Sequence, residues 1–205
     1  MGRRLLALTV SLALMGVCIA IFKIVGFGTD PSATFITGLS LLTGLSFGTC
    51  MLLLNLALFL VVLRYDLSRI GVGTVMNMAG VGYMADFTLY LLRPVVPEGG
   101  LPIGVRLAVF GGTMALFLTV AAFYLAADLG VAPSDAIPQL IAARVQKPSY
   151  RGIRMIWDLS LLTAGFLLGA EVGLTTLLTG FCLGPAIAFV SSRVEGWFGE
   201  SRSRV

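Results

Sequence analysis

The sequence predicts an all-α membrane protein in which six transmembrane helices and two short re-entrant or interfacial helices form two inverted three-span repeats. Composition is the first indication, because 58% of the 205 residues are hydrophobic and only 12% are charged. Soluble domains carry about 25% charged residues, and the mean hydropathy here is +0.98. The second indication is a series of membrane-length apolar runs whose flanking basic residues gather on one side. The third is an internal repeat with a period of about 100 residues.

Six apolar runs have the length of about 20 residues that a hydrocarbon core about 30 Å thick requires. The first run follows Arg3 and Arg4 and resembles a signal peptide, but it continues to Val25 without an A-x-A-like cleavage site. We therefore expect it to be retained as a first span. The six expected spans are residues 4–25, 46–64, 70–92, 103–126, 150–169 and 171–193.

Two further segments, residues 31–44 and 133–146, are helix-like but too short to cross a bilayer. Their length is typical of re-entrant or interfacial helices, and the sequence leaves that choice open. Pro31 and Pro133 suit the first position of each helix, where the missing N–H has no intrahelical partner. Asp30 is well placed to cap the first of them.

The starts of these short helices are candidate ligand-binding positions. A helix N-terminus has free N–H groups and a partial positive charge, so one that dips into the membrane would favour an anionic group of a substrate. Alternatively, both segments are surface helices with well-formed starts. In either case Ser32 and Ser134 can help to satisfy the remaining amides.

The basic residues predict the orientation of the chain, because Lys and Arg accumulate in cytoplasmic loops. With the N-terminus inside, eleven basic residues fall on the cytoplasmic side and only three on the outer side. We therefore expect both termini in the cytoplasm and an even number of spans. The three outer residues are Lys23, Arg93 and Arg106.

Patterns in the first half of the chain return in the second half. Gly71-Val72-Gly73 aligns with Glu171-Val172-Gly173 at an offset of 100, the short helices begin at an offset of 102, and Asn55 aligns with Asp158 at an offset of 103. Each half holds three expected spans, an odd number, so the second copy should lie upside down relative to the first, as in many secondary transporters. The expected parts are a first repeat at 1–93, an outer linker at 94–102, an inverted second repeat at 103–194 and a polar cytoplasmic tail at 195–205.

Asp158 is the most informative ionisable residue, because it lies near the middle of an expected span, where an acid normally faces the bundle interior or a wet pathway. Arg154 lies on the same helical face and could pair with it. A desolvated carboxylate suits proton transfer, whereas an ion pair would keep Asp158 ionised and structural, and both roles stay open. Asn55, at the equivalent place, could hydrogen-bond across the pseudo-two-fold axis.

We expect the solute-binding side chains to lie on the spans and at the starts of the short helices. Asp86 and Glu171 are assigned structural or interfacial roles, while Lys23 and Arg106 are expected to extend their charged groups to the membrane interface. The candidate substrate-binding residues are Asp30, Ser32, Asn55, Thr74, Asn77, Ser134, Asp135 and Asp158.

The residue inventory disfavours several classes of site. The chain has no histidine, which removes the commonest proton shuttle and transition-metal ligand. Cys18, Cys50 and Cys182 lie in apolar runs without CxxC spacing, so neither a disulfide framework nor a thiolate metal site is predicted. We expect no catalytic residues, metal or cofactor. Nucleic acid is not an expected partner, since the basic residues lie in short clusters between apolar runs.

Gly71-Val-Gly-Thr74 followed by Gly80, together with the short-helix openings Gly28-x-x-Pro31 and Gly130-x-x-Pro133, resembles the YczE/YyaS/YitT group of bacterial integral membrane proteins, the YczE branch most closely. The resemblance covers about residues 5–193. The second copy departs from it, with Glu171 and Leu174 at the places of Gly71 and Thr74. The resemblance implies a multi-pass protein of the bacterial plasma (inner) membrane with a poorly defined activity, and it supplies no catalytic residues.

Two functions are compatible with these features. The leading one is a small permease or channel-like transporter for an unidentified small solute, with its site between the inverted halves. The alternative is a non-transporting regulatory or accessory membrane protein that binds a partner through its helices. An enzyme is disfavoured, because the sequence has neither a nucleophile motif nor carboxylates at metal-ligand spacing. The expected partners are the lipid bilayer and the solute, with homo-oligomerisation left open.

Overall fold

The computed structural model describes residues 2–66, 70–97, 100–127, 129–145, 150–176 and 178–179. All the regular structure within these ranges is helical, which confirms the all-α class. The helices are α1 Gly2–Val25, α2 Pro31–Thr43, α3 Phe47–Tyr65, α4 Val72–Leu92, the 3-10 helix η2 Arg93–Val95, α5 Ile103–Ala126, α6 Pro133–Ala142 and α7 Tyr150–Leu167. Residues 174–176 are helical as well, whereas most of the sixth expected span lies outside the described ranges.

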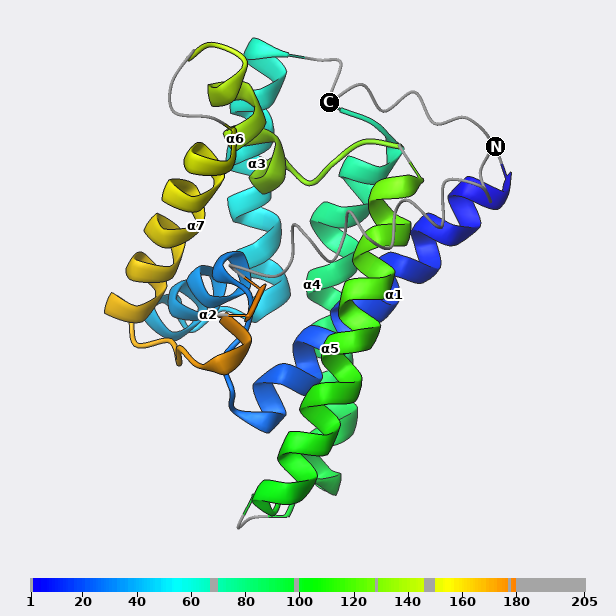
Figure 1. Ribbon diagram of the computed structural model, residues 1–205, viewed down its shortest axis with the longest axis vertical. Coiled ribbons are helices and arrows are strands. Elements are labelled where there is room, and N and C mark those ends of the chain that lie inside the picture. The colour runs from blue at the N-terminus through cyan, green and yellow to red at the C-terminus, as the bar shows by residue number, and fades with distance from the viewer. Residues whose placement is uncertain are drawn as a thin grey trace.

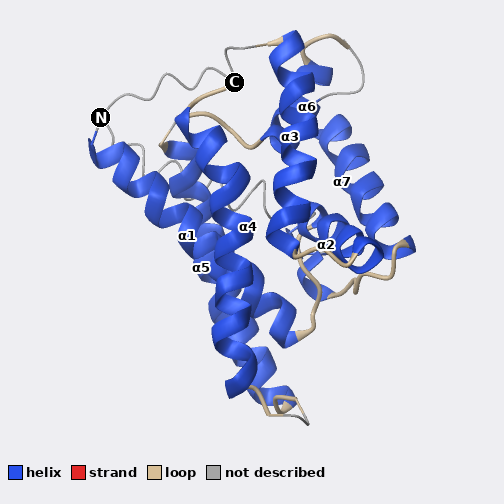
Figure 2. Cartoon of the chain, turned by 180° about the vertical axis from the view of Figure 1, so that it is seen from behind, coloured by secondary structure: helices blue, strands red, loops and turns tan. Residues whose placement is uncertain are grey.

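The helices form two groups that face each other across the middle of the molecule (Figure 1). Helices α1, α4 and α5 make up one group, and α2, α3, α6 and α7 make up the other, as the view from behind also shows (Figure 2). Helix α3 also packs on α4, which joins the two groups. Within the second group the pairing is crossed, because α2 packs on α7 and α6 packs on α3. Each short helix therefore packs on a long helix from the other half of the chain as well as on one from its own half.

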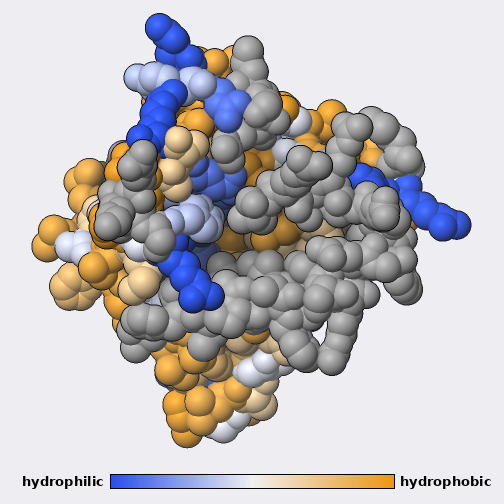
Figure 3. Space-filling view, turned by 45° about the horizontal axis from the view of Figure 1, so that its top comes forward, coloured by the Kyte–Doolittle hydropathy of each residue, from blue (hydrophilic) through white to orange (hydrophobic). Residues whose placement is uncertain are grey.

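Three of the described helices are long and apolar enough to cross a membrane, namely α1, α3 and α5. Large apolar side chains also lie on the outside of the molecule, with Leu60, Tyr90 and Leu167 exposed by 61%, 77% and 77%. Hydrophobic residues dominate the described part of the face in Figure 3. Soluble monomers rarely expose so much contiguous apolar surface. The surface and the three helices together indicate a membrane protein.

The core between α1 and α5 is aromatic. The Phe22 ring lies 6.0 Å from the Phe110 ring and 5.8 Å from the Phe117 ring, measured between centroids. These tilted and edge-to-face contacts are the favoured geometries for aromatic pairs. Cys18 is buried beside them, and Cys50 is buried on α3. Cys182 lies outside the described residues.

Glycines allow the crossed helix pairs to approach closely. A Cβ atom at Gly165 of α7 would lie 2.8 Å from both the Thr34 carbonyl oxygen and the Phe35 backbone nitrogen of α2. Real Cβ atoms essentially never approach other atoms so closely. On the α2 side, a Cβ at Gly38 would lie 2.7 Å from the Leu168 Cβ. The backbones of α2 and α7 therefore touch directly, as small residues permit between helices in lipid.

We expect Gly165→Ala to destabilise the protein by about 1–3 kcal/mol, because the added methyl group must displace the α2 backbone. Gly111→Ala is the matched control, since a Cβ at Gly111 of α5 meets nothing within 4 Å. The control should be neutral or stabilising, because alanine favours a helix over glycine by about 1 kcal/mol. Thermal unfolding in detergent measures both, and equal effects of the two variants would contradict the close α2–α7 contact.

Candidate functional site

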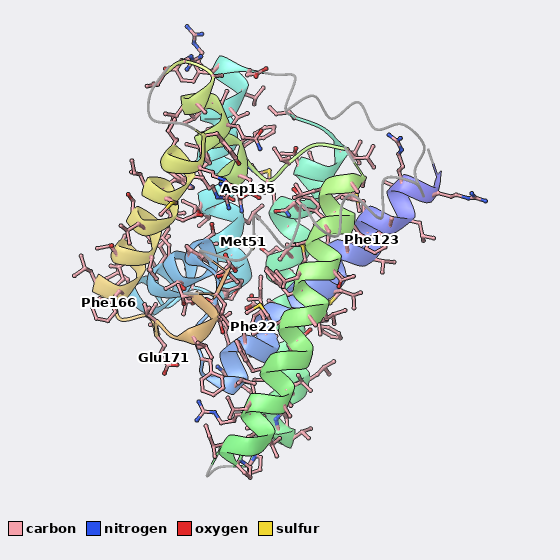
Figure 4. The ribbon with its side chains drawn as sticks, viewed as in Figure 1. Phe22, Met51, Phe123, Asp135, Phe166 and Glu171 are labelled. Atoms are coloured by element: carbon pink, nitrogen blue, oxygen red, sulfur yellow. The ribbon has the colours of Figure 1, made fainter. Side chains whose placement is uncertain are left out.

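An arginine on α7 binds two carboxylates in the interior of the molecule. The Arg154 Nε atom donates to Asp158 Oδ2 at 2.9 Å, and Nη1 donates to Asp135 Oδ1 of α6 at 2.9 Å. The side chains of all three residues are mostly buried, with exposures of 27%, 17% and 31%. The predicted pairing of Arg154 with Asp158 is confirmed, but the bridge to Asp135 was not foreseen. Figure 4 places Asp135 between the two groups of helices.

Asp30 adds a third carboxylate to this group. Its Oδ1 atom accepts the N–H of Ala33 at 3.1 Å, so it caps α2 as the sequence predicted. Burial raises the pKa of Asp30 to about 6 against the hydrogen bond from Ala33, and the nearby carboxylates of Asp135 and Asp158 add to the rise. We call Asp30, Asp135, Arg154 and Asp158 the carboxylate cluster. Its acids outnumber its single base, so the cluster is negatively charged when all its members are ionised.

Two buried amides lie on α3 and α4. Asn55 is 1% exposed, and its Nδ2 atom donates to Met51 O at 3.0 Å. Asn77 is 4% exposed. The Oδ1 atoms of both have no hydrogen-bond partner within the described structure. A buried acceptor without a partner costs about 1–3 kcal/mol, so each amide has unused capacity to bind a donor.

The packing of α3 on α4 brings these amides to one level. Gly48 and Met51 of α3 both lie against Gly82 of α4. Because the two helices are consecutive and antiparallel (Figure 1), moving from that contact toward Asn55 on α3 corresponds to moving from Gly82 toward Asn77 on α4. Asn55 and Asn77 are thus buried at a similar level of the two helices, and their role in binding a solute stays a prediction.

Thr74 is part of a junction between the start of α4 and the loop that precedes α6. The Gly73 N–H donates to Leu129 O at 2.8 Å, and the Thr74 hydroxyl donates to Val131 O at 2.9 Å. Gly130 has a φ of 105°, and a Cβ there would lie 2.7 Å from the Gly71 nitrogen. We call this the first junction. It commits the Thr74 hydroxyl to holding two chain segments together.

The same contacts recur between the loop that precedes α2 and residues 173–176. The Thr175 N–H donates to Phe27 O at 2.9 Å, and the Thr176 hydroxyl donates to Thr29 O at 2.8 Å. Gly28, with a φ of 80°, would place a Cβ 2.6 Å from the Gly173 nitrogen. We call this the second junction. Every residue in it is 102 positions from its counterpart in the first junction.

The paired junctions correct the alignment of the two halves. Gly173 and Thr176 make the contacts that Gly71 and Thr74 make, so the offset here is 102 rather than 100. Glu171 and Leu174 therefore do not occupy those places. The error arose because a Val-Gly match was followed instead of the offset already visible at the prolines of the short helices.

The remaining candidate residues lie apart from these contacts. Ser32 and Ser134 are partly buried in the first turns of α2 and α6. Asp86 Oδ2 accepts the Gly48 N–H at 2.8 Å and so stabilises the start of α3, as its assigned structural role implies. Glu171 is exposed. Within the described ranges, no group of three or more His, Cys, Asp or Glu side chains is arranged to hold a metal ion.

Comparison with known proteins places the chain in a family whose function is not known. The sequence matches DUF6198, described as a family of unknown function, over residues 2–192. An uncharacterized protein of Haemophilus influenzae is 27% identical over 183 residues, which cover 87% of this chain and 79% of that protein. No solved structure matches significantly. The resemblance to the YczE/YyaS/YitT group is not confirmed by these matches and stays a prediction.

We expect Thr74→Val and Thr176→Val each to destabilise the protein by about 1–3 kcal/mol, because each leaves a buried carbonyl of the opposite loop without its donor. Thr74→Ser and Thr176→Ser keep the hydroxyl and should cost clearly less. Thermal unfolding of the four variants in detergent measures this. Stability losses that are the same for Val and Ser would show that the hydroxyl contacts do not matter.

We expect the contribution of Asp30 to stability to depend on pH. Because its folded-state pKa of about 6 exceeds its ordinary value of 3.8, the contribution is fully present below about pH 4 and is lost as the pH rises through 6. Asp30→Asn keeps a capping oxygen but cannot ionise. Its melting temperature should therefore improve relative to the unsubstituted protein between pH 4.5 and 7.5.

Ser46→Ala is the control for this titration. The Ser46 hydroxyl oxygen caps α3 by accepting the Thr49 N–H at 3.2 Å, and it does not titrate. Its loss should lower the melting temperature by the same amount across the pH range. If the difference in melting temperature between Asp30→Asn and the unsubstituted protein does not change from pH 4.5 to 7.5, Asp30 does not ionise in this range.

Proposed function

The chain belongs to the DUF6198 family, and from its own residues we propose that it is a small multi-pass permease or channel-like transporter of the bacterial inner membrane. In this proposal α1, α3, α4, α5, α7 and a helix at 171–193 are the six spans. Both termini are cytoplasmic, and the solute crosses between two inverted halves. The chain is a carrier of solute rather than an enzyme.

The pair of junctions is the observation that carries the proposal. A loop of the first half binds the helix start at 173–176, and the equivalent loop of the second half binds the helix start at 71–74. If a two-fold axis relates the halves, a contact from the loop of one half to the helix start of the other must occur twice, as it does here. With three spans in each half, that axis lies in the membrane plane, the arrangement in which secondary transporters bind substrate at the repeat interface.

The position of the carboxylate cluster supports a solute site at this interface. It forms where α2 and α6 begin, and α7 packs on both of these helices. Asn55 corresponds to Asp158 at an offset of 103, so a charged wall and a neutral wall face the proposed pathway. Acidic groups at such depth in a membrane mark proton or solute pathways. In the resting protein Arg154 holds Asp158 ionised at 2.9 Å. Asp158 is the proposed proton carrier in the step in which the solute displaces this bond, because only the released carboxylate takes up a proton.

The proposal is tested by solute-driven proton movement. Proteoliposomes that contain a trapped pH-sensitive dye are exposed in turn to a panel of small solutes. At least one solute should move protons through the unsubstituted protein, and Asp158→Asn should reduce that movement at least tenfold. Asp66→Asn removes a carboxylate at the end of α3, outside the cluster, and should keep the activity.

Cysteine labelling distinguishes transport from the accessory role. In a cysteine-free background, Asn55→Cys and Asp158→Cys should react with a membrane-impermeant thiol reagent, because water reaches a pathway. Leu56→Cys and Leu159→Cys are the controls, since these neighbours are 45% and 62% exposed on the outer surface and should be shielded by lipid. If none of the four reacts, the interface is dry, and the alternative of a non-transporting accessory protein is favoured.

A further inference from the structure

A cleft with a volume of about 660 Å³ opens between the C-terminal part of α1, helix α2 and the end of α4. Its volume is in the range of small-molecule sites. Phe22 and Glu171 line it, and Figure 4 shows both well away from Asp135. Neither Asn55 nor Asp158 contributes to its wall. The cleft is therefore a different place from the carboxylate cluster.

Lys23 is a basic residue in the wall of this cleft. Its Nζ atom lies 3.7 Å from the centroid of the Phe47 ring. Within the part of the chain that the structure describes, Lys23 makes no hydrogen bond or ion pair. An ammonium carries three N–H donors, and taking a charge out of water is costly unless it is paired. Lys23 in the cleft wall thus carries N–H donors that have no acceptor among the described residues.

The charged side chains in and beside the cleft are Lys23, Arg93 and Arg106 against Asp86 and Glu171, which leaves one net positive charge. Arg93 lines the same cleft and lies near enough to Lys23 for their charges to repel. Asp86 attracts Lys23 more strongly than Arg93 repels it, and the Asp86 Oδ2 atom also accepts the Gly48 N–H. Glu171 lies beside Arg106, because both side chains come within 4 Å of a Cβ built on Gly26. An anion between Lys23 and Arg93 would relieve their repulsion.

The remaining wall suits the rest of an organic molecule. The hydroxyls of Thr37 and Ser40 line the cleft and already donate to Ala33 O at 2.7 Å and Leu45 O at 2.6 Å. Their oxygen lone pairs are left to accept hydrogen bonds. Apolar side chains cover other parts of the wall; they include Phe22, Ile24, Leu41, Leu89 and Val96.

We propose that this cleft binds a small organic oxyanion, a carboxylate or a phosphate ester, through Lys23 and Arg93. The oxygen atoms of the oxyanion accept hydrogen bonds from the N–H groups of Lys23 and Arg93. The carbon skeleton lies on the apolar wall, and a hydroxyl or amine of the ligand donates to Thr37 or Ser40. The site needs no transport to operate, so it goes beyond the proposed permease.

The charge preference of the cleft is measured with two thiol reagents of opposite charge. The full chain, with Cys18, Cys50 and Cys182 replaced by alanine, carries Ser40→Cys as its single thiol. It is treated in detergent with the anionic sulfonatoethyl or the cationic trimethylammonioethyl methanethiosulfonate. We expect the ratio of anionic to cationic rates to be about tenfold higher than at Leu42→Cys, since a charged cleft raises local counter-ion concentration by at least that factor. Leu42 lies on the same helix and is 68% exposed.

Substitutions then assign this preference to named side chains. Lys23→Gln or Arg93→Gln should each bring the ratio at Ser40→Cys toward that at Leu42→Cys, whereas Lys23→Arg should keep it. If a Gln variant does not fold, raising the salt concentration of the parent protein should lower the ratio instead, because salt screens the field. The proposal would be overturned if Ser40→Cys reacted faster with the cationic reagent or with neither reagent. It would also be overturned if the ratio of rates did not change with Lys23→Gln or with salt.

Ligand protection identifies the source of the oxyanion. Millimolar benzoate or glycerol phosphate should slow labelling of Ser40→Cys, and the more effective of the two distinguishes a carboxylate site from a phosphate site. Protection by neither would count against an organic oxyanion. The labelling experiments do not depend on transport. A negative labelling result would therefore count against the oxyanion site and not against the transporter, and a lack of proton movement would count against the transporter and not against the oxyanion site.

Discussion

The free backbone groups at the breaks between helices constrain this structure more than any single side chain does. The first turn of a helix carries N–H groups that have no partner within the helix, and an apolar molecule has little water to satisfy them. Here the unpaired groups are matched in pairs. At the start of α4 the Gly73 N–H donates to Leu129 O, and the Thr74 hydroxyl donates to Val131 O. In the segment from 173 the Thr175 N–H donates to Phe27 O, and the Thr176 hydroxyl donates to Thr29 O. Each half of the chain is therefore completed by the other, and the crossed packing of α2 on α7 and of α6 on α3 follows from that exchange.

Local features of the sequence were sufficient to locate the helices. Proline at the first helical position and Asp30 before it define the start of α2, and the apolar run 103–126 coincides with α5. Contacts between the halves could not be predicted, because they join residues that no periodicity relates. The bond from Arg154 to Asp135 and the contact of Gly165 with Thr34 belong to this class. Lys23 was assigned to the interface from its place near the end of a span, since sequence alone does not show that a cleft opens beside it.

The two halves agree in their backbone contacts and differ in the charges they carry. Arg154 and Asp158 lie on α7, whereas α3 carries Met51 and Asn55 at the places 103 residues earlier. Asp30 caps α2, but Ala132 at the start of α6 makes no side-chain cap. The backbone contacts of the two junctions are thus alike, whereas the Arg154–Asp158 pair and the Asp30 cap have no charged counterpart in the other half. A framework of this kind can hold the same shape around very different polar groups.

Gly28 and Thr29 belong to the second junction and also line the cleft beside Lys23. Anything that occupies the cleft therefore touches the loop whose carbonyl oxygens hold Thr175 and Thr176. Such shared atoms create thermodynamic linkage, and linkage is reciprocal. An occupant that favours the bonds from Thr175 and Thr176 to this loop must itself be favoured by these bonds to the same factor. Occupancy of the cleft is consequently coupled to the stability of the second junction.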